Sequence, residues 1–336
     1  MKKIIVIIIS VVIGNFTLRA QDIHFSQYYS APVNLNPAMT GYMGGDQRAI
    51  LNYRNQWSSI SSPFVTMAGS FDAALFREDM GGDWVGAGVM VAKDQAGTLS
   101  LARTRVVLSG SFVKKLNDKN YLSAGAQGGF NQRSIDYTNM LVDAQITPSG
   151  FDNSMPHNED VSKMNQTFFD FNAGLVWGYR PSDFLDVYTG LALMNFNGPG
   201  DGIIDGDKTL GMRSVFHSGA NVVLNDKWIL QPALIFQAQQ NVGELIIGGA
   251  LGRDLEPTNE DVTRIAYAGV WYRNQDAIVP YAGIEIESWK LGISYDINMS
   301  DLNLASQSKG GFELSLKWEI PRPSLRMYRA VPCPRF

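Results

Sequence analysis

The sequence predicts an all-β protein: a closed transmembrane outer-membrane β-barrel of about fourteen antiparallel strands, with irregular N- and C-terminal flanks. Three observations predict it. From Ala49 onward the chain divides into segments of about ten residues with alternating polarity, short turns alternate with long loops, and the tryptophans gather near the segment ends. A weak alternation repeated over many ten-residue segments is typical of transmembrane barrels.

The alternation is clearest in two segments. In residues 122–130 small or apolar side chains alternate with Ser, Gly and Gln, and in residues 291–297 an unbroken apolar set alternates with Gly292, Ser294 and Asp296. A period of two places the two sets on opposite faces of a sheet. The predicted strands start near Ala49, Val65, Val85, Arg103, Tyr121, Thr167, Leu185, Ser214, Trp228, Glu244, Arg264, Ile278, Lys290 and Gly311. An even number closes the sheet, because a bilayer offers no water to a free edge.

The connections also favour a barrel. Those after the fourth, sixth, eighth and twelfth strands are tight and those after the fifth, seventh and thirteenth are long, so both termini are predicted to be periplasmic. The connections after the second and tenth strands are longer than this rule allows, so either the count slips there or these turns have a purpose. The longest loop, Asp136 to about Gln166, should face outside as a partner-binding lid, a folded-in plug or a solvated loop.

The tryptophans fall at or just beyond the predicted strand ends, where the aromatic girdles of a membrane barrel lie. They are Trp57, Trp84, Trp177, Trp228, Trp271, Trp289 and Trp318.

The flanks have a different composition from the barrel, residues 47–320. Residues 1–20 read as a signal peptide: Lys2 and Lys3 precede an apolar run that is too short to span a membrane, which needs about 20 residues. Residues 21–46 are rich in Asn, Ser, Gly and Pro and should be irregular or briefly helical, in the periplasm or the lumen. Residues 321–336 contain four prolines and should form a periplasmic or lumenal tail.

Charge and cysteine content narrow the function. Loss of residues 1–20 lowers Lys and Arg from 28 to 25 against 32 Asp and Glu, a net charge of about −7, which argues against nucleic acid as a partner. A single cysteine, Cys333, excludes an internal disulfide. It is flagged as a reactive or ligating thiol, and the arginines around it either dock on an acidic partner or are solvated.

The polar constellations do not indicate an enzyme or a cofactor. His24, His157 and His217 lie far apart in the chain, and only His217, near Ser214 and Ser218, merits inspection as part of a hydrolase. The alternative for His217 is a polar residue facing the lumen or the interface. The loop Asp201–Asp207 has the carboxylates of a Ca²⁺ site but lacks the spacing of an EF-hand, which favours an ordinary surface loop.

Several motifs occur in a specific order along nearly the whole chain. They are Phe25-Ser26-Gln27-Tyr28, Asn36-Pro37-Ala38, Gly41, Tyr53-Arg54-Asn55-Gln56-Trp57, Ser70-Phe71-Asp72 and Cys333-Pro334. Together they resemble the PorP/SprF family of type IX secretion membrane proteins.

The resemblance implies a non-enzymatic barrel of the secretion and gliding apparatus. Members typically pair with a large secreted protein, often an adhesin, and support its export or surface retention through its C-terminal domain. The implied partners are that domain, periplasmic and outer-membrane components of the apparatus, and lipid. No catalytic role is carried over. Asn36 and Pro37 are interpreted as turn formers, and Arg54 with Trp57 as residues that fix the first strand at the interface.

Two other functions remain open at this point. A passive porin or hydrophobic-solute channel has a similar strand number, and it would conduct ions unless the N-terminal segment or the large loop blocks the lumen. A barrel lipase would depend on His217.

Overall fold

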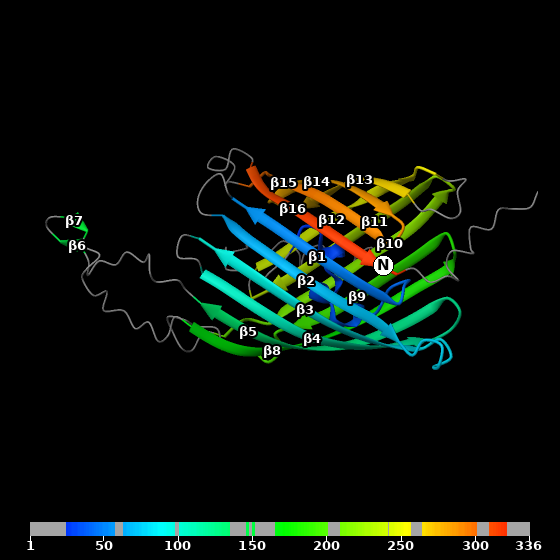
Figure 1. The fold of residues 1–336 in the computed structure, drawn as a ribbon, viewed down its shortest axis with the longest axis horizontal. Coiled ribbons are helices and arrows are strands. Elements are labelled where there is room, and N and C mark those ends of the chain that lie inside the picture. The colour runs from blue at the N-terminus through cyan, green and yellow to red at the C-terminus, as the bar shows by residue number, and fades with distance from the viewer. Residues whose placement is uncertain are drawn as a thin grey trace, which may run out of the picture.

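The fold is a closed antiparallel barrel of fourteen strands (Figure 1). The computed structural model describes residues 25–57, 63–97, 101–134, 146–147, 150–151, 165–200, 209–240, 242–256, 264–300 and 309–320. Within these ranges no helix is long and apolar enough to cross a membrane.

The barrel strands follow one another around the wall in chain order. They are β1 (Gln47–Gln56), β2 (Phe64–Leu75), β3 (Trp84–Ala96), β4 (Leu101–Lys115), β5 (Asn120–Ser134), β8 (Asn165–Ser182), β9 (Leu185–Met194), β10 (Arg213–Asn225), β11 (Trp228–Gln239), β12 (Val242–Asp254), β13 (Arg264–Arg273), β14 (Ala277–Ile286), β15 (Trp289–Asn298) and β16 (Lys309–Glu319). Two further short strands, β6 (Ile146–Thr147) and β7 (Gly150–Phe151), pair only with each other in the described part of the chain. The predicted fold class and strand number are therefore confirmed, and each predicted start lies within two residues of an observed one.

The first and last strands close the barrel. β1 pairs with β16 from Arg48 opposite Glu319 to Gln56 opposite Gly311. Closure gives every wall strand a neighbour on both sides, so the backbone amides are satisfied without water.

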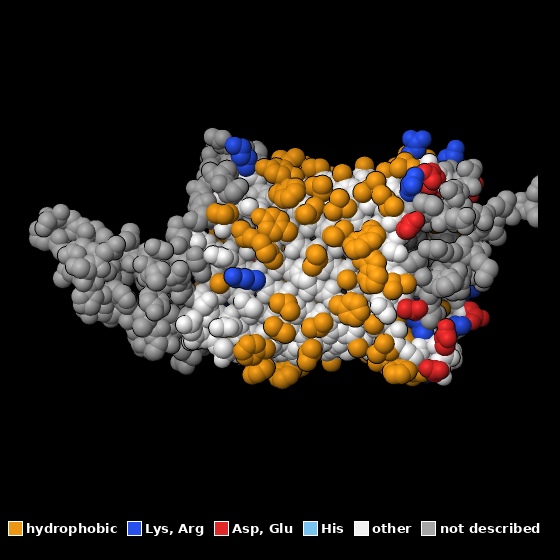
Figure 2. Space-filling view, in the orientation of Figure 1, with side chains coloured by type: hydrophobic (Ala, Val, Ile, Leu, Met, Phe, Trp, Pro, Cys, Tyr) orange, Lys and Arg blue, Asp and Glu red, His pale blue; other side chains and the backbone are white. Residues whose placement is uncertain are grey.

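The polarity of alternate residues decides which side chains face the membrane. On β15, Leu291, Ile293 and Tyr295 point outward and are about 40% exposed, whereas Ser294 and Asp296 point inward and are buried. Figure 2 shows the result: apolar side chains cover the middle of the barrel, and acidic and basic side chains gather at one end.

That end carries the tight connections 116–119, 183–184, 226–227 and 287–288, and we call it the turn end. The longer connection after β2 lies there too and is built from turns, with Met80 N donating to Phe76 O. Since the strand count holds, this connection has a structural purpose: it carries Arg77, which donates to Gly41 O and Met43 O of the N-terminal segment. Part of the connection after β12 lies outside the described residues.

The girdle interpretation is wrong for two tryptophans. Trp84 and Trp271 are buried and face the lumen, where Trp84 donates to Gly41 O and Trp271 stacks on Tyr29. Trp177 and Trp289 are about half exposed on the outside, as a girdle requires. Both inward tryptophans pack against the N-terminal segment, whose path cannot be predicted from the alternation of polarity in the strands.

That segment is residues 25–46, which lie inside the barrel. It contains three short helical turns: η1 (Tyr28–Ser30), α2 (Pro32–Leu35) and η2 (Pro37–Met39). We call residues 25–45 the plug. The sequence was consistent with a location of this segment in either the periplasm or the lumen, and the structure places it in the lumen.

Candidate functional site: a plugged lumen

The start of the plug is held by two carboxylates of the wall. Glu313 of β16 accepts backbone N–H groups from Ser26, at 2.7 Å, and from Gln27, at 2.9 Å. The Gln27 side chain donates to Ser294 Oγ at 3.0 Å and accepts from Ser315 Oγ at 2.8 Å. Ser26 Oγ donates to Asp296 at 2.9 Å. Ser26 and Gln27 therefore bind the polar side chains on the inner face of β15 and β16.

Buried arginines neutralise these carboxylates. Arg54 of β1 lies 3.2 Å from Asp296 and 3.1 Å from Glu313, and Arg273 of β13 lies 3.1 Å from Asp296 and 3.2 Å from Glu244. Arg273 also donates to Ser26 Oγ. Ions are tolerated away from water only when they are paired and hydrogen-bonded. We call Arg54, Arg273, Asp296, Glu313 and Glu244 the plug cluster, because these charges lie on five wall strands and those on β13, β15 and β16 bind the plug directly.

Arg54 is only 1% exposed, so its interpretation as an interfacial residue is wrong. The parity of β1 explains this, since Arg54 shares the inner face with Arg48 and Asn52. Trp57 does lie at the end of β1, where its ring meets Phe64 edge-on at 5.0 Å.

A second attachment lies at the turn end. The carboxylate of Asp72 accepts from the backbone N of Gly41 at 2.8 Å and from Arg48 at 2.7 Å, and Arg48 also donates to Met39 O at 3.0 Å. Gly41 has φ +64, and a Cβ there would lie 2.7 Å from the backbone of Gly86. Glycine is required here by both conformation and space.

The middle of the plug is fixed by Asn36. Its Oδ1 accepts from Ala38 N at 2.9 Å, which caps η2, and its Nδ2 reaches Leu175 O, Leu191 O and His217 Nε2. Pro37 is the first residue of η2. The turn-forming interpretation of Asn36 and Pro37 agrees with this geometry, but the sequence did not indicate the contacts of Asn36 with β8, β9 and β10.

Wall glycines make room for this part of the plug. A Cβ on Gly125 of β5 would lie 2.4 Å from the backbone of Pro37, and one on Gly174 of β8 would lie 1.9 Å from Asn36 Oδ1. Distances of this kind mean that the plug backbone at Pro37 and the Asn36 side chain lie directly against the wall strands.

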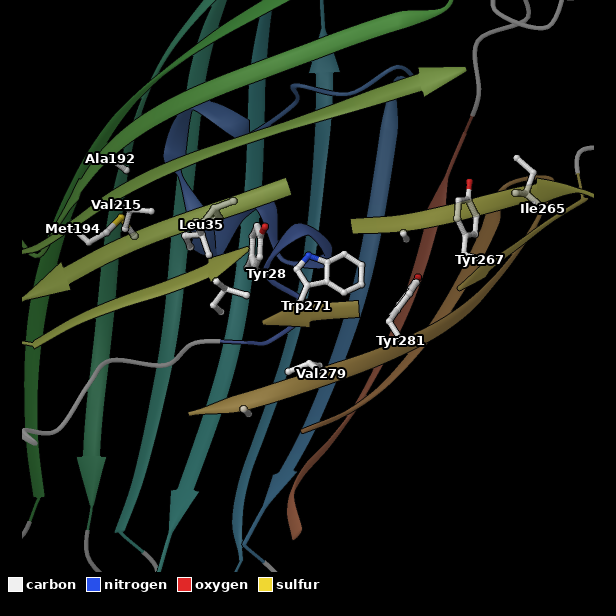
Figure 3. Packing of buried hydrophobic residues seen from close by; sticks show 14 residues of the cluster. Tyr28, Leu35, Ala192, Met194, Val215, Ile265, Tyr267, Trp271, Val279 and Tyr281 are labelled. Carbon is white, nitrogen blue, oxygen red and sulfur yellow. The ribbon is translucent and has the colours of Figure 1, made fainter. Parts of the chain in front are cut away.

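Aromatic rings of the plug pack against aromatic rings of the wall; Figure 3 shows Tyr28 of the plug near Trp271, with Tyr281 further along the wall. Tyr29 stacks on Trp271 with ring centroids 4.8 Å apart and meets Tyr28 and Tyr281 edge-on. Burial raises the pKa of Tyr28 and of Tyr29 above its usual value, so both plug hydroxyls stay protonated. Phe25 packs in a separate buried cluster with Ala31, Ala68 and Ala92.

A separate ion cluster lies within the wall. Arg105 of β4 donates to Asp170 of β8 at 2.9 and 3.1 Å, and Asn131 and Asn172 donate to the same carboxylate. We call these four residues the wall cluster. It links strands β4, β5 and β8 across the inner face.

The remaining candidates are resolved only in part. His217 faces the lumen, while Ser214 and Ser218 lie on the other face of β10, so no Ser-His pair forms. Tyr53 lies on the outer face of β1. Cys333, Pro334, His24, His157 and the Asp201–Asp207 loop lie outside the described residues. In the part of the chain that the structure describes, no group of three His, Cys, Asp or Glu side chains is arranged to hold a metal.

The most informative residues that the motifs missed are Asp296, Glu313 and Arg273. Their signal was present in the sequence, since each is a charged residue at an inward position of an otherwise alternating strand.

A closed fourteen-stranded wall with an apolar outer belt and a polar, occupied lumen defines a plugged outer-membrane β-barrel. The model of the type IX secretion system membrane protein family PorP/SprF matches residues 17–318, and the chain belongs to that family.

Comparison with curated proteins gave no match. Among solved structures, the chain is similar to a Pseudomonas aeruginosa FadL homologue, with 9% identity, 84% of this chain and 92% of that chain covered, and a TM-score of 0.47. It is also similar to the P. putida toluene transporter TodX, with 11% identity, 85% and 93% covered, and a TM-score of 0.45. The corresponding values for the KdgM porin are 7%, 81%, 99% and 0.40.

Proposed function

We propose that this barrel is a non-enzymatic docking component of type IX secretion and gliding machinery. It supports the export and surface anchoring of a large secreted adhesin through the adhesin's C-terminal domain. A leader at residues 1–20 directs export and is cleaved. In the membrane, the turn end faces the periplasm and the secretion components there, and the opposite end, with its long loops, faces outside and meets the cargo.

One observation carries the proposal: the lumen is occupied by the plug. The plug cluster, the Asp72–Arg48 pair and Asn36 attach the plug at three levels to strands around the barrel. A segment whose backbone N–H groups and hydroxyls bind buried wall carboxylates closes a pore more firmly than a solvated loop does, because hydrogen bonds to charged groups are stronger than neutral ones. An open porin has no need of such an attachment.

The inner face also favours binding over catalysis. His217 is buried against Asn36 of the plug, and the neighbouring serines face away from it, so the lipase alternative loses its catalytic pair.

The first test is copurification. The chain should be isolated by an affinity tag from native outer membranes of cells that make the secretion apparatus. We expect a very large secreted protein to copurify, and we expect cells without the chain to release that protein into the medium. Isolation of the barrel alone from such cells, together with unchanged surface retention, would contradict the proposal.

The second test separates docking from passive transport. The purified full chain in planar bilayers should show almost no ion conductance. Steady conductance of the wild-type chain would favour the porin alternative.

A further inference from the structure

A cavity of about 450 Å³ lies between the plug and the turn end of the barrel, and we call it the vestibule. Plug residues Met39, Tyr42, Met43 and Gly44 form one side of it. Residues of strands β1, β3, β4, β5, β8, β9, β10 and β16 form most of the rest. Its volume lies within the range of about 300–1,000 Å³ that is typical of small-molecule sites.

The charges in the lining of the vestibule are balanced locally. Each of its five cations lies 2.5–3.9 Å from a carboxylate, so the lining does not select an anion. The ligand that suits such a lining is uncharged, because it does not have to displace an ion pair. The pairs are Arg48–Asp72, Arg77–Asp46, Lys115–Asp118, Arg180–Asp186 and Lys317–Glu319.

One of these ion pairs is accessible to hydroxyl groups. The side chains of Arg180 and Asp186 are 43% and 28% exposed. A hydroxyl group is both a donor and an acceptor, so it can donate to the Asp186 carboxylate or accept from the Arg180 guanidinium while the pair stays intact. Hydrogen bonds to charged groups are stronger than neutral ones. A ligand with several neighbouring hydroxyl groups therefore fits this pair.

Tyrosine and glycine alternate along one row of the wall beside this ion pair. Tyr121 of β5 lies opposite Gly178 of β8, and Gly178 lies opposite Tyr188 of β9. Tyr188 in turn lies opposite Gly219 of β10. Both tyrosines line the vestibule. Two strand steps separate them, which is roughly 10 Å at about 4.8 Å per step and is comparable with the length of a disaccharide.

The glycines of this row allow tyrosine side chains to lie along the wall. A Cβ on Gly219 would lie 2.6 Å from Cζ and 3.0 Å from Cε1 of Tyr188, and a Cβ on Gly178 would overlap the hydroxyl of Tyr42. The Tyr188 ring therefore lies across Gly219. Since one side of the ring is covered by this glycine, the other side borders the vestibule.

An aromatic ring in this position suits the C–H groups of a sugar. The face of an aromatic ring carries partial negative charge, which attracts polarised C–H groups. A sugar ring presents C–H groups on its flat side and hydroxyl groups at its edge. Asp186 lies two residues before Tyr188 on β9, and both line the vestibule, so one sugar can contact the ring and the ion pair together.

We propose that the vestibule binds a short, uncharged oligosaccharide, with one sugar ring against Tyr188 and its hydroxyl groups on the Arg180–Asp186 pair. The site is distinct from the outer loops assigned to cargo. Only the compartment of the ligand rests on the proposed function: with the turn end in the periplasm, the ligand is a soluble oligosaccharide or a glycan chain of the cell wall.

Calorimetric titration of the purified full chain tests the proposal, in an amine-oxide detergent whose headgroup is not a sugar. The probe is chitotriose, a neutral trisaccharide. The reference is trigalacturonate, which is similar in size and anionic. We expect saturable binding of chitotriose and no binding of trigalacturonate at the same concentration.

Two variants of Tyr188 test the role of its ring, since Tyr188→Leu removes the ring and Tyr188→Phe keeps it. The matched control is Tyr267→Leu. Tyr267 also lies across a glycine, Gly252, but it is not part of the vestibule lining, and Lys290 Nζ lies 3.7 Å from its ring centroid. We expect Tyr188→Leu to lose chitotriose affinity roughly tenfold, and Tyr188→Phe and the control to lose less than about twofold. Heat-dependent migration in electrophoresis verifies that each barrel is folded.

A further variant unbalances the charge of the lining. Asp186→Asn removes the carboxylate beside Arg180, so the lining gains positive charge. We expect it to weaken chitotriose binding several-fold and to create binding of trigalacturonate. Its matched control is Asp226→Asn, in an exposed turn at the same end, which should change neither.

Three results would overturn the proposal: no saturable binding of chitotriose, equal losses in Tyr188→Leu and Tyr267→Leu, or equal binding of trigalacturonate by the wild-type chain. None of them bears on the copurification of cargo, so the two proposals fail independently. Sedimentation with purified cell-wall sacculi then distinguishes the sources of the ligand. Cosedimentation that chitotriose abolishes would indicate a cell-wall glycan, and chitotriose binding without cosedimentation would indicate a soluble oligosaccharide.

Discussion

The plug cluster and the wall cluster use the same chemistry in two places. In both, buried arginines are paired with carboxylates at about 3 Å on the inner face of the barrel. Two carboxylates of the plug cluster, Asp296 and Glu313, also accept bonds from Ser26 and Gln27, which belong to the plug. The carboxylate of the wall cluster accepts from Asn131 and Asn172, which belong to the wall.

This difference separates closure of the lumen from stability of the barrel. A buried ion pair contributes little net stability, but removal of one partner leaves an uncompensated charge and costs about 3–5 kcal/mol. In the wall cluster the uncompensated charge lies between strands, so the loss of its partner should lower the free energy of unfolding of the barrel. In the plug cluster the cost can be relieved when the plug leaves and water enters. Paired variants can therefore test whether the two functions are separable.

The largest effect is expected from the two arginines. Arg54→Met should raise ion conductance in planar bilayers at least tenfold, because Glu313 and Asp296 lose a neutralising partner and attract water. Arg105→Met should lower the thermal unfolding midpoint of the barrel and change conductance less than twofold. Equal conductance in the two variants would mean that the clusters do not differ in function.

A smaller effect is expected where the plug touches the wall without charges. Gly125→Ala forces a Cβ against the plug backbone at Pro37, whereas the nearest atom to a Cβ at Gly110, on the adjacent strand, is 3.8 Å away. Overpacking typically costs about 1–3 kcal/mol. Gly125→Ala should therefore increase conductance several-fold, and Gly110→Ala should match the wild type in both conductance and unfolding midpoint.

The sequence predicted the outer face of the barrel far better than its interior. Apolar residues such as Leu291 and Ile293 must face lipid, and this single requirement fixes the strand, its start and its parity. The alternation also placed Ser294 and Asp296 on the face opposite these apolar residues, and in the barrel that face is the inner one. The strand number followed from the same rule, because every strand meets the same lipid.

The interior depends on a different kind of information. Arg54 and Asp296 are 242 residues apart, and they meet only because closure brings β1 beside β16. The path of the plug then decides which inward residues become partners. Trp84 and Trp271 show the consequence, since their positions near strand ends are equally consistent with a girdle and with plug packing. Burial against the plug is not encoded in the local pattern.

Substitution of aromatic residues should also distinguish the plug from the wall, with a still smaller change in conductance. Tyr29 and Trp271 stack across the plug boundary at 4.8 Å, and Trp177 and Tyr179 stack at 5.7 Å on β8 alone. A double-mutant cycle with Tyr29→Leu and Trp271→Leu should give a coupling energy of about 0.5–1.5 kcal/mol in unfolding experiments, together with increased conductance. The corresponding cycle for Trp177 and Tyr179 should leave conductance unchanged.

The smallest effect is expected from two asparagines that bond to backbone groups. Asn36 Oδ1 accepts from Ala38 N in the plug, and Asn225 Oδ1 accepts from Lys227 N and Trp228 N in a wall turn. Loss of such a hydrogen bond between a side chain and the backbone costs about 1 kcal/mol in either place. Asn36→Ala should destabilise the seated plug by this amount and produce brief conducting events, because the Asn36 side chain also links the plug to His217 of the wall. Asn225→Ala should lower the unfolding midpoint by a similar amount without such events. Brief events in both variants would mean that the plug senses the stability of the whole wall, and the separation of closure from stability would then fail.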